Sequence, residues 1–289
     1  MYDGRGTLPM KHSLPFLALS LALLSATPGR ADQLTVLGSA DTFAVLAGST
    51  ITNTGATVLS GNVGLYPGTS ATGFSTVTLT NGTLYIADGV AQTAQSNALT
   101  GFNYLSGLPS TQNLTGQDLG GLVLFPGVYT YSSTAQLTGA LTVNFAGTNN
   151  ADVVIQVGSA LTTASASSVN VINQGTGDNL YFEVGSSATL GTGTMFEGDL
   201  LAYTSITLDT GASISCGSAL ALNGAVTLDT NVINNCSSTG SDITPLGTGG
   251  GTGGGTGGGP SPVPEPASFA LLATGLLGAA GAVRRRYVA

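Results

Sequence analysis

Basic side chains are nearly absent from this sequence, and between residues 32 and 283 there are none. The six Lys and Arg residues and the single His all lie near the ends: Arg5, Lys11, His12, Arg30, Arg284, Arg285 and Arg286. The long central part is therefore purely acidic and has no Lys, Arg or His with which to form salt bridges. Such a surface repels nucleic acid and phosphate ligands, so neither is expected as a partner. Folding has to depend on apolar burial and backbone hydrogen bonds.

The same absence excludes most catalytic chemistry. Without His, Lys or Arg, the central part has no triad base, Schiff-base lysine or arginine clamp. Carboxylate chemistry of the glycosidase type remains, and the available acids are Asp178, Glu183, Glu197, Asp199, Asp209 and Asp229. Two of them, Asp209 and Asp229, stand beside turns at equivalent repeat positions, where capping is the commoner role. We therefore predict that the protein is not an enzyme. Without His or a free thiolate the only metal ligands are oxygens, which would suit Ca²⁺, but no Ca²⁺-loop motif occurs, so we predict no metal or cofactor site.

The N-terminal part has the pattern of a secretory signal peptide. Residues 1–31 contain a short basic start, an apolar run over 14–24, and small residues before an expected cleavage between Ala31 and Asp32. Two cysteines, Cys216 and Cys236, remain in the exported chain. Thiols oxidise outside the cytoplasm, so we predict that these two form one disulfide.

The C-terminal part divides into a linker and an apolar tail. Residues 247–262 are mostly glycine and predict a flexible tether, and residues 263–289 combine a Pro-rich start, an apolar run and three arginines. The tail resembles the PEP-CTERM sorting signal, whose motif matches Val263, Pro264, Glu265 and Pro266. This resemblance implies a Gram-negative source, removal of the tail by an exosortase, and delivery to the cell surface, the extracellular matrix or the medium. The membrane would be contacted only transiently, through the short apolar helix. A plain C-terminal anchor is the alternative.

Residues 32–246 are expected to form one domain dominated by short strands. Alternating segments such as TVTLT (76–80) and LTVNF (141–145) predict strands, and glycines mark the turns between them. One segment differs: residues 88–105 carry Val90, Ala94, Ala98, Phe102 and Leu105 at helical spacing. We predict one long helix there, with Asp88 as its N-cap.

A repeat then indicates how the strands stack. Thr189, Thr207 and Thr227 align at offsets of 18 and 20 residues, and the same offsets align a leucine one position after each threonine. The pattern also places Thr192, Thr210 and Thr230 in one column and extends back to Thr162 and Ser165. Inward leucines and outward threonines at such a period predict an irregular parallel β-solenoid. The two cysteines are 20 residues apart, about one coil, so they would lie on adjacent coils.

Several long segments resemble the ice-binding-like (DUF3494) family. They are LGSADTFAVLAGSTITNTGAT (37–57), LTGQDLGGLVLFPGVYTYSS (114–133), VGSSATLGTGTMFEGDLLAYTSITLDTGAS (184–213) and ALALNGAVTLDTN (219–231). The resemblance covers about residues 36–236. It implies a discontinuous right-handed parallel β-helix with one long α-helix packed alongside, in agreement with the repeat. It also implies ice as the partner for at least some members.

The ice-binding members carry Thr, then Ala or Gly, any residue, then Thr or Asn on successive coils. Thr54-Gly55-Ala56-Thr57 fits fully; residues 72–75, 165–168 and 210–213 fit with serine substitutions, and 192–195 and 230–233 depart from the motif. We therefore predict an ice-contacting face drawn from Thr54, Thr57, Thr72, Ser75, Thr162, Ser165, Ser168, Thr189, Thr192, Thr207, Thr210, Ser213, Thr227 and Thr230.

Three functions remain open at this point. The leading hypothesis is a secreted protein that adsorbs to ice through a flat face of Ser and Thr, where γ-methyl groups and hydroxyls on a rigid backbone order water. The second is a structural or adhesive protein of the exopolysaccharide matrix, in which Thr and Ser are β-compatible surface residues and the partner is a sugar or another protein. A carboxylate-dependent glycosidase is a distant third.

Overall fold

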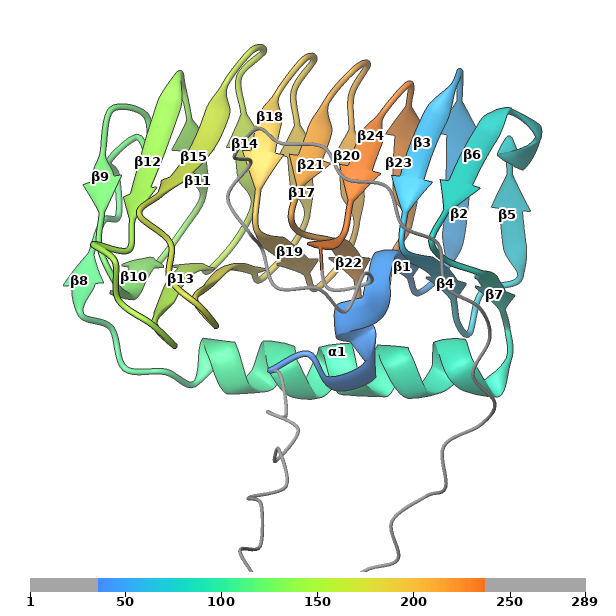
Figure 1. Ribbon diagram of the computed structural model, residues 1–289, viewed down its shortest axis with the longest axis horizontal. Coiled ribbons are helices and arrows are strands. Elements are labelled where there is room, and N and C mark those ends of the chain that lie inside the picture. The colour runs from blue at the N-terminus through green and yellow to red at the C-terminus, as the bar shows by residue number, and fades with distance from the viewer. Residues whose placement is uncertain (1–35, 237–289) are drawn as a thin grey trace, which may run out of the picture. The chain divides into compact units, whose positions relative to one another are not determined.

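The computed structural model describes residues 36–236, in which 24 short strands form three parallel sheets beside one α-helix (Figure 1). Sheet A contains, in spatial order, β7 (Leu84–Ile86), β4 (Asn62–Leu65), β1 (Phe43–Ala47), β22 (Ala219–Ala221), β19 (Asp199–Ala202), β16 (Asn179–Val184), β13 (Asp152–Val157), β10 (Gly127–Tyr131) and β8 (Gln112–Asn113). Sheet B contains β11 (Ala135–Leu137), β14 (Leu161–Thr163), β17 (Ala188–Leu190), β20 (Ile206–Leu208), β23 (Val226–Asp229), β2 (Thr50–Thr54) and β5 (Ser70–Thr72).

Sheet C completes the three-sided stack. It contains β6 (Val77–Thr80), β3 (Thr57–Ser60), β24 (Val232–Asn234), β21 (Ser213–Ser215), β18 (Met195–Glu197), β15 (Ser168–Ile172), β12 (Ala140–Asn144) and β9 (Val123–Leu124). The helices are α1 (Gly89–Ser106) and the short 3₁₀ segments η1 (Gly38–Thr42) and η2 (Phe74–Thr76). Each full coil contributes one strand to sheet A, the next to sheet B and the third to sheet C. The predicted parallel β-solenoid with a flanking helix is confirmed.

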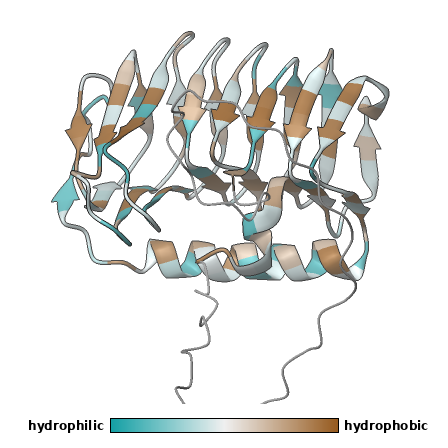
Figure 2. Cartoon of the chain, viewed as in Figure 1, coloured by the Kyte–Doolittle hydropathy of each residue, from teal (hydrophilic) through white to brown (hydrophobic). Residues whose placement is uncertain are grey.

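The alternation of the sequence produces the core. In β17, β20 and β23 the residues before and after the central threonine are buried, and Leu190, Leu208 and Leu228 stack in register inside the solenoid. Figure 2 shows this alternation as brown and pale bands along the strands. Because each coil repeats the pattern, one continuous apolar core runs the length of the stack.

The coils do not stack in the order of the sequence. The N-terminal coil, β1–β2–β3, pairs on one side with the coil that follows it, β4–β5–β6, and on the other with the C-terminal coil, β22–β23–β24. Helix α1 then runs along the stack and connects β7 at one end to β8 at the other (Figure 1). The remaining coils return toward β1. The solenoid is therefore discontinuous, as the family resemblance implied.

Helix α1 covers the outer face of sheet A. Asp88 caps it, because its Oδ1 accepts a hydrogen bond of 2.9 Å from the N–H of Ala91. The buried helix face carries Ala94, Ala98, Phe102 and Leu105, together with the small residues Ala91 and Gly101. It packs against apolar side chains that sheet A presents outward, such as Tyr181, Leu201 and Leu220. Val90, predicted to lie on this face, is instead 47% exposed, and Ala91 is buried in its place.

The predicted disulfide is present between Cys216 and Cys236, whose Cα atoms are 4.7 Å apart. It joins the residue after β21 to the residues that follow β24, on the next coil. Replacing both cysteines by serine should lower the free energy of unfolding by about 3 kcal/mol, because the open chain gains conformational freedom when unfolded. Chemical denaturation of the two proteins measures this difference. Equal midpoints would show that the bond contributes little beyond the coil contacts.

Some predictions fall outside residues 36–236. They are the signal peptide (1–31), the ends of the predicted domain, the glycine linker (247–262) and the sorting tail with its short apolar helix (263–289). Within the described residues, no helix is long and apolar enough to cross a membrane.

Candidate functional site

The outer face of sheet B carries an unbroken row of six threonines. Strand pairing places one on each of six successive coils, in the order Thr162, Thr189, Thr207, Thr227, Thr52 and Thr72. Five of them stand between buried neighbours, Thr72 at the end of the row stands between half-buried Ala71 and exposed Gly73, and all six are themselves exposed or half-buried. We call this the threonine row. Parallel strands repeat at about 4.8 Å, so methyl groups and hydroxyls recur at that spacing along the row.

Small residues line one side of the threonine row and keep the face flat. The residues two positions before the six threonines are Ala160, Ser187, Ser205, Ala225, Thr50 and Ser70. Two of the serine hydroxyls accept backbone hydrogen bonds: Ser205 Oγ accepts from the N–H of Ala225 at 3.2 Å, and Ser187 Oγ from that of Ser205 at 3.4 Å. These side chains therefore lie against the sheet.

A second row runs along the turn between sheets B and C. Backbone hydrogen bonds and strand pairing align Ser165, Thr192, Thr210, Asp229 and Thr54, one per coil. The four hydroxyl side chains are exposed and Asp229 is half-buried. We call this the turn row. Together the two rows bring eleven of the described residues to one side of the solenoid, and ten of them are Thr or Ser.

The repeat predicted that Thr230 shares a column with Thr192 and Thr210, and this prediction is wrong. Thr207 pairs with Thr227, but Thr210 aligns with Asp229, so the last coil is one residue shorter at this corner. Thr230 instead takes a left-handed conformation with φ of 56°, at the position that Gly211 and Gly55 fill on the neighbouring coils.

Other predicted residues lie elsewhere. Thr57 is fully buried at the start of β3, and its Oγ1 accepts a hydrogen bond of 3.1 Å from the N–H of Asn231, so it cannot reach a surface ligand. Ser168 and Ser213 open strands of sheet C rather than sheet B, and Ser168 is 9% exposed. Ser75 lies in η2 and is exposed.

One member of the threonine row was missed by the sequence prediction. Thr52 lies between Thr227 and Thr72, and its hydroxyl is 3.4 Å from that of Thr227. The alternation in Thr50-Ile-Thr-Asn-Thr54 marks it as an outward residue. Its place beside a residue 175 positions later could not be read from any local repeat.

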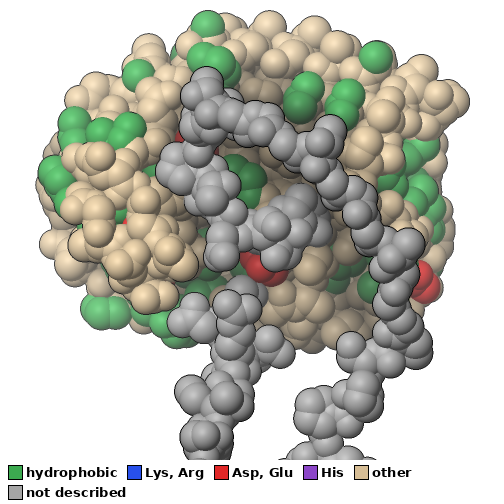
Figure 3. Space-filling model, viewed as in Figure 1, with side chains coloured by type: hydrophobic (Ala, Val, Ile, Leu, Met, Phe, Trp, Pro, Cys, Tyr) green, Lys and Arg blue, Asp and Glu red, His purple; other side chains and the backbone are tan. Residues whose placement is uncertain are grey.

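The threonine row contains no titratable side chain, and charge appears at its borders, in Asp209 and Asp229 beside it and in Asp118, two coils beyond Thr162. No Lys, Arg or His occurs anywhere within residues 36–236, and Figure 3, which views the solenoid from the side of sheet C, accordingly shows no blue or purple on the described side chains. A flat, rigid and nearly uncharged surface of this kind suits adsorption to a regular lattice. It does not suit the binding of an ion or the activation of a nucleophile.

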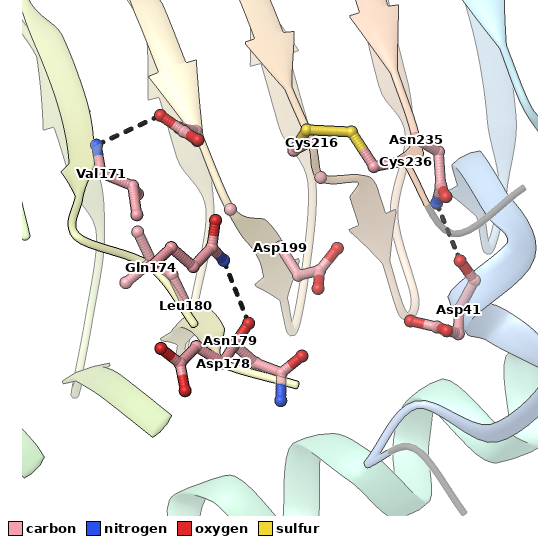
Figure 4. A pocket seen from close by; sticks show the side chains of 13 residues that line it. Asp41, Val171, Gln174, Asp178, Asn179, Leu180, Asp199, Cys216, Asn235 and Cys236 are labelled. Atoms are coloured by element: carbon pink, nitrogen blue, oxygen red, sulfur yellow. Dashed lines mark hydrogen bonds between the residues drawn. A yellow bond between two sulfur atoms is a disulfide. The ribbon is translucent and has the colours of Figure 1, made fainter. Parts of the chain in front are cut away.

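Three of the six candidate acids lie elsewhere, at the corner between sheets C and A (Figure 4). A cavity of about 90 Å³ is lined there by Asp178, Glu197 and Asp199 among others. Burial raises the pKa of Asp199 to about 7, although a hydrogen bond from Ser218 opposes the shift and the nearby Asp41 adds to it. Burial also raises the pKa of Glu197.

Each of these carboxylates already holds part of the fold. Asp178 accepts hydrogen bonds from the N–H groups of Ala151 at 2.8 Å and Gly175 at 2.7 Å. Glu197 accepts from the N–H of Val171 at 3.2 Å, and Asp199 from the hydroxyl of Ser218 at 2.7 Å. In the described part of the chain, no group of three or more His, Cys, Asp or Glu side chains is placed to hold a metal ion. The corner therefore offers structural acceptors, and the geometry favours the hydroxyl face as the functional site.

Comparison with known proteins identifies the family of the chain. A model of the ice-binding-like family matches residues 45–234, which is more than half of the chain. The chain belongs to the ice-binding-like family. An ice-binding protein of Nostoc sp. (strain HG1) is 53% identical over 213 residues, covering 74% of this chain and 78% of the relative. One from Colwellia sp. is 32% identical, covering 68% and 82%.

Solved structures of the family share the fold. An ice-binding protein from an Antarctic biological consortium aligns with a TM-score of 0.64 and 42% identity, covering 68% of this chain and 89% of that one. That of the Antarctic ascomycete Antarctomyces psychrotrophicus aligns with a TM-score of 0.65 and 39% identity, covering 68% and 96%. A PEP-CTERM protein-sorting motif also matches residues 262–286, so this family member is exported to the cell surface or secreted.

Proposed function

We propose that this protein binds ice through the outer face of sheet B, with the threonine row as the central contact and the turn row beside it. The observation that carries the proposal is the register of six threonines on six coils of a rigid solenoid. Relatives in the same family, including one 53% identical, are named ice-binding proteins.

The mechanism is adsorption. Spacings of about 4.8 Å along the row and about 6.7 Å between alternate outward positions of a strand are comparable to oxygen spacings on ice planes. The γ-methyl groups limit competing hydration while the hydroxyls anchor ordered water, and the β-branch restricts each side chain to few rotamers. Water ordered on this face then joins the crystal. The adsorbed protein molecules hinder growth of the ice surface that lies between them.

Recrystallisation inhibition and thermal hysteresis of the exported protein test the proposal. We expect ice crystals in a frozen sugar solution to stay small at low protein concentration. If neither effect appears with correctly folded protein, the second hypothesis replaces the first: a structural or adhesive component of the exopolysaccharide matrix. The sorting motif supports that alternative on its own, since it directs the protein to the same location.

The point at which the described chain ends supports a tethered mode of action. Cys236 follows β24 at the corner between sheets C and A, which in a three-sided coil lies opposite sheet B. The described chain therefore ends on the side of the solenoid away from the threonine row. We therefore propose that the protein can hold ice while attached to a Gram-negative cell surface or its matrix.

Processing of the tail can be tested separately. We expect an exosortase to remove the residues after about Pro266, because the motif, the apolar run and Arg284–Arg286 follow in the order such signals have. Intact-mass measurement of surface material from the native host gives the result directly. Detection of the three arginines in that material would contradict exosortase processing and favour a plain anchor.

A further inference from the structure

Asp229 is the one carboxylate inside the two rows of the proposed ice face. It occupies the turn row between Thr210 and Thr54, where the other four members are hydroxyl residues. Its position is fixed from both sides, because its C=O accepts a hydrogen bond from the N–H of Gly211 and β23 pairs with β2 through Thr54. The carboxylate is therefore built into the row and is not a side chain on a loop beside it.

The contacts of Asp229 also engage its neighbours. One carboxylate oxygen accepts a hydrogen bond from Thr210 Oγ1, and the other accepts from Thr230 Oγ1 at 3.1 Å. Its own N–H donates to Asn231 Oδ1 at 2.6 Å. Two threonine hydroxyls are thus directed toward the carboxylate. Among residues 36–236 no cation is present to neutralise it.

We infer that Asp229 is a specificity-determining residue that interrupts the turn row and confines ice contact on these coils to the threonine row. The inference rests on the proposed function. A carboxylate holds its hydration shell more strongly than a hydroxyl, so ordering the water above it into a lattice costs more free energy. It also holds the Thr210 hydroxyl in a hydrogen bond within the protein, where it is less available to lattice water.

Completing the row should strengthen ice binding. In Asp229→Thr the position receives the methyl and hydroxyl of its neighbours, and in Asp229→Asn the charge is removed while an oxygen acceptor for Thr210 is kept. We expect the concentration that half-inhibits recrystallisation to fall by roughly threefold or more for Asp229→Thr and by less for Asp229→Asn. Both variants remove the cost of desolvating the carboxylate, but only threonine also adds a methyl group and a hydroxyl that can contact ice. Asp152→Asn, which removes one charge at the start of β13 in sheet A, is the matched control and should leave ice binding unchanged.

Two results would overturn the inference. One is an unchanged Asp229→Thr protein, and the other is weaker ice binding in both Asp229 variants, provided that thermal unfolding shows them to be folded. Failure of the proposed function looks different: wild-type protein would not inhibit recrystallisation, or Thr207→Tyr, at the centre of the threonine row, would inhibit as well as wild type. Because Thr207 pairs with Thr189 and Thr227 in the threonine row while Asp229 belongs to the turn row, the two experiments give separate answers.

Discussion

Replacing Thr207 with tyrosine is expected to raise the protein concentration that half-inhibits recrystallisation by about tenfold or more, because contact residues at the centre of an interface dominate binding. Thr207 stands third of six in the threonine row and pairs with Thr189 on one side and Thr227 on the other. Adsorption to a crystal plane needs many weak contacts to form together. A tyrosine ring that projects from the middle of the row lifts both neighbours away from the plane.

The same substitution should leave the fold intact. Thr207 points outward from a three-residue strand whose flanking residues, Ile206 and Leu208, fill the core. Tyrosine has good strand propensity, so the free energy of unfolding should change by less than about 1 kcal/mol. Ser215→Tyr is the matched control, since Ser215 is exposed in a three-residue strand of sheet C on a neighbouring face. It should keep full ice activity.

If Thr207→Tyr and Thr189→Tyr both inhibit recrystallisation as well as wild type, sheet B is not the ice face. Loss of activity in Ser215→Tyr with retention in Thr207→Tyr would move the site to sheet C. The outer face of sheet C is irregular in composition, since Met195, Ser213 and Val232 follow one another in register there. That irregularity is the physical reason for placing the contact on sheet B.

Local repetition made much of this fold predictable from the sequence. The leucine and threonine columns through Thr189, Thr207 and Thr227 follow from the alternation of side chains in strands and from a nearly constant coil length. Helix α1 followed from apolar spacing and a capping aspartate. The disulfide followed from two cysteines in a chain with an export signal, and their separation of 20 residues, about one coil, agreed with it. In each case the information lies within one or two coils.

Two features of the site could not be obtained in this way. The position of Thr52 depends on insertion of the N-terminal coil next to the last one, a contact between segments 175 residues apart. The exchange of Thr230 for Asp229 in the turn row depends on a one-residue shortening of the last coil, which an alignment by residue type conceals. Both features depend on how coils that are far apart in the sequence stack on one another. A repeat that relates neighbouring coils carries no information about such contacts.

Stability should rise as the pH falls, with a melting temperature near pH 4.5 higher than that near pH 8 by on the order of 10 °C. Glu183 is the main cause. It lies in β16 beside Leu201 of β19 and beside Gln156 of β13, whose Nε2 donates to the C=O of Leu105 in α1, and it is only 5% exposed. Burial raises its pKa from the ordinary 4.5 to about 7. Asp199, with a pKa of about 7, and Glu197, whose pKa is also raised, act in the same direction.

The direction follows from proton binding. Between about pH 4 and pH 7 the folded state keeps these protons while the unfolded chain has lost them, so the free energy of unfolding falls as the pH rises through this range. A shift of this size at Glu183 corresponds to up to about 3 kcal/mol. Most folded proteins offset a buried carboxylate with a nearby cation. Here none is available among the described residues, so protonation is the remaining way to reduce the cost.

Two variants separate burial from overall charge. Glu183→Gln removes one negative charge from a buried site and should raise the melting temperature at pH 8 while flattening the dependence between pH 4 and 7. Asp118→Asn removes one negative charge from an exposed site and should have the opposite effect at pH 8. Burial raises the pKa of Asp118, but hydrogen bonds from the N–H groups of Thr138 and Gly120 outweigh it and leave the pKa lowered, so its ionised form stabilises the fold. If both variants raise the melting temperature equally, general repulsion in an acidic chain governs its pH response and burial of Glu183 does not.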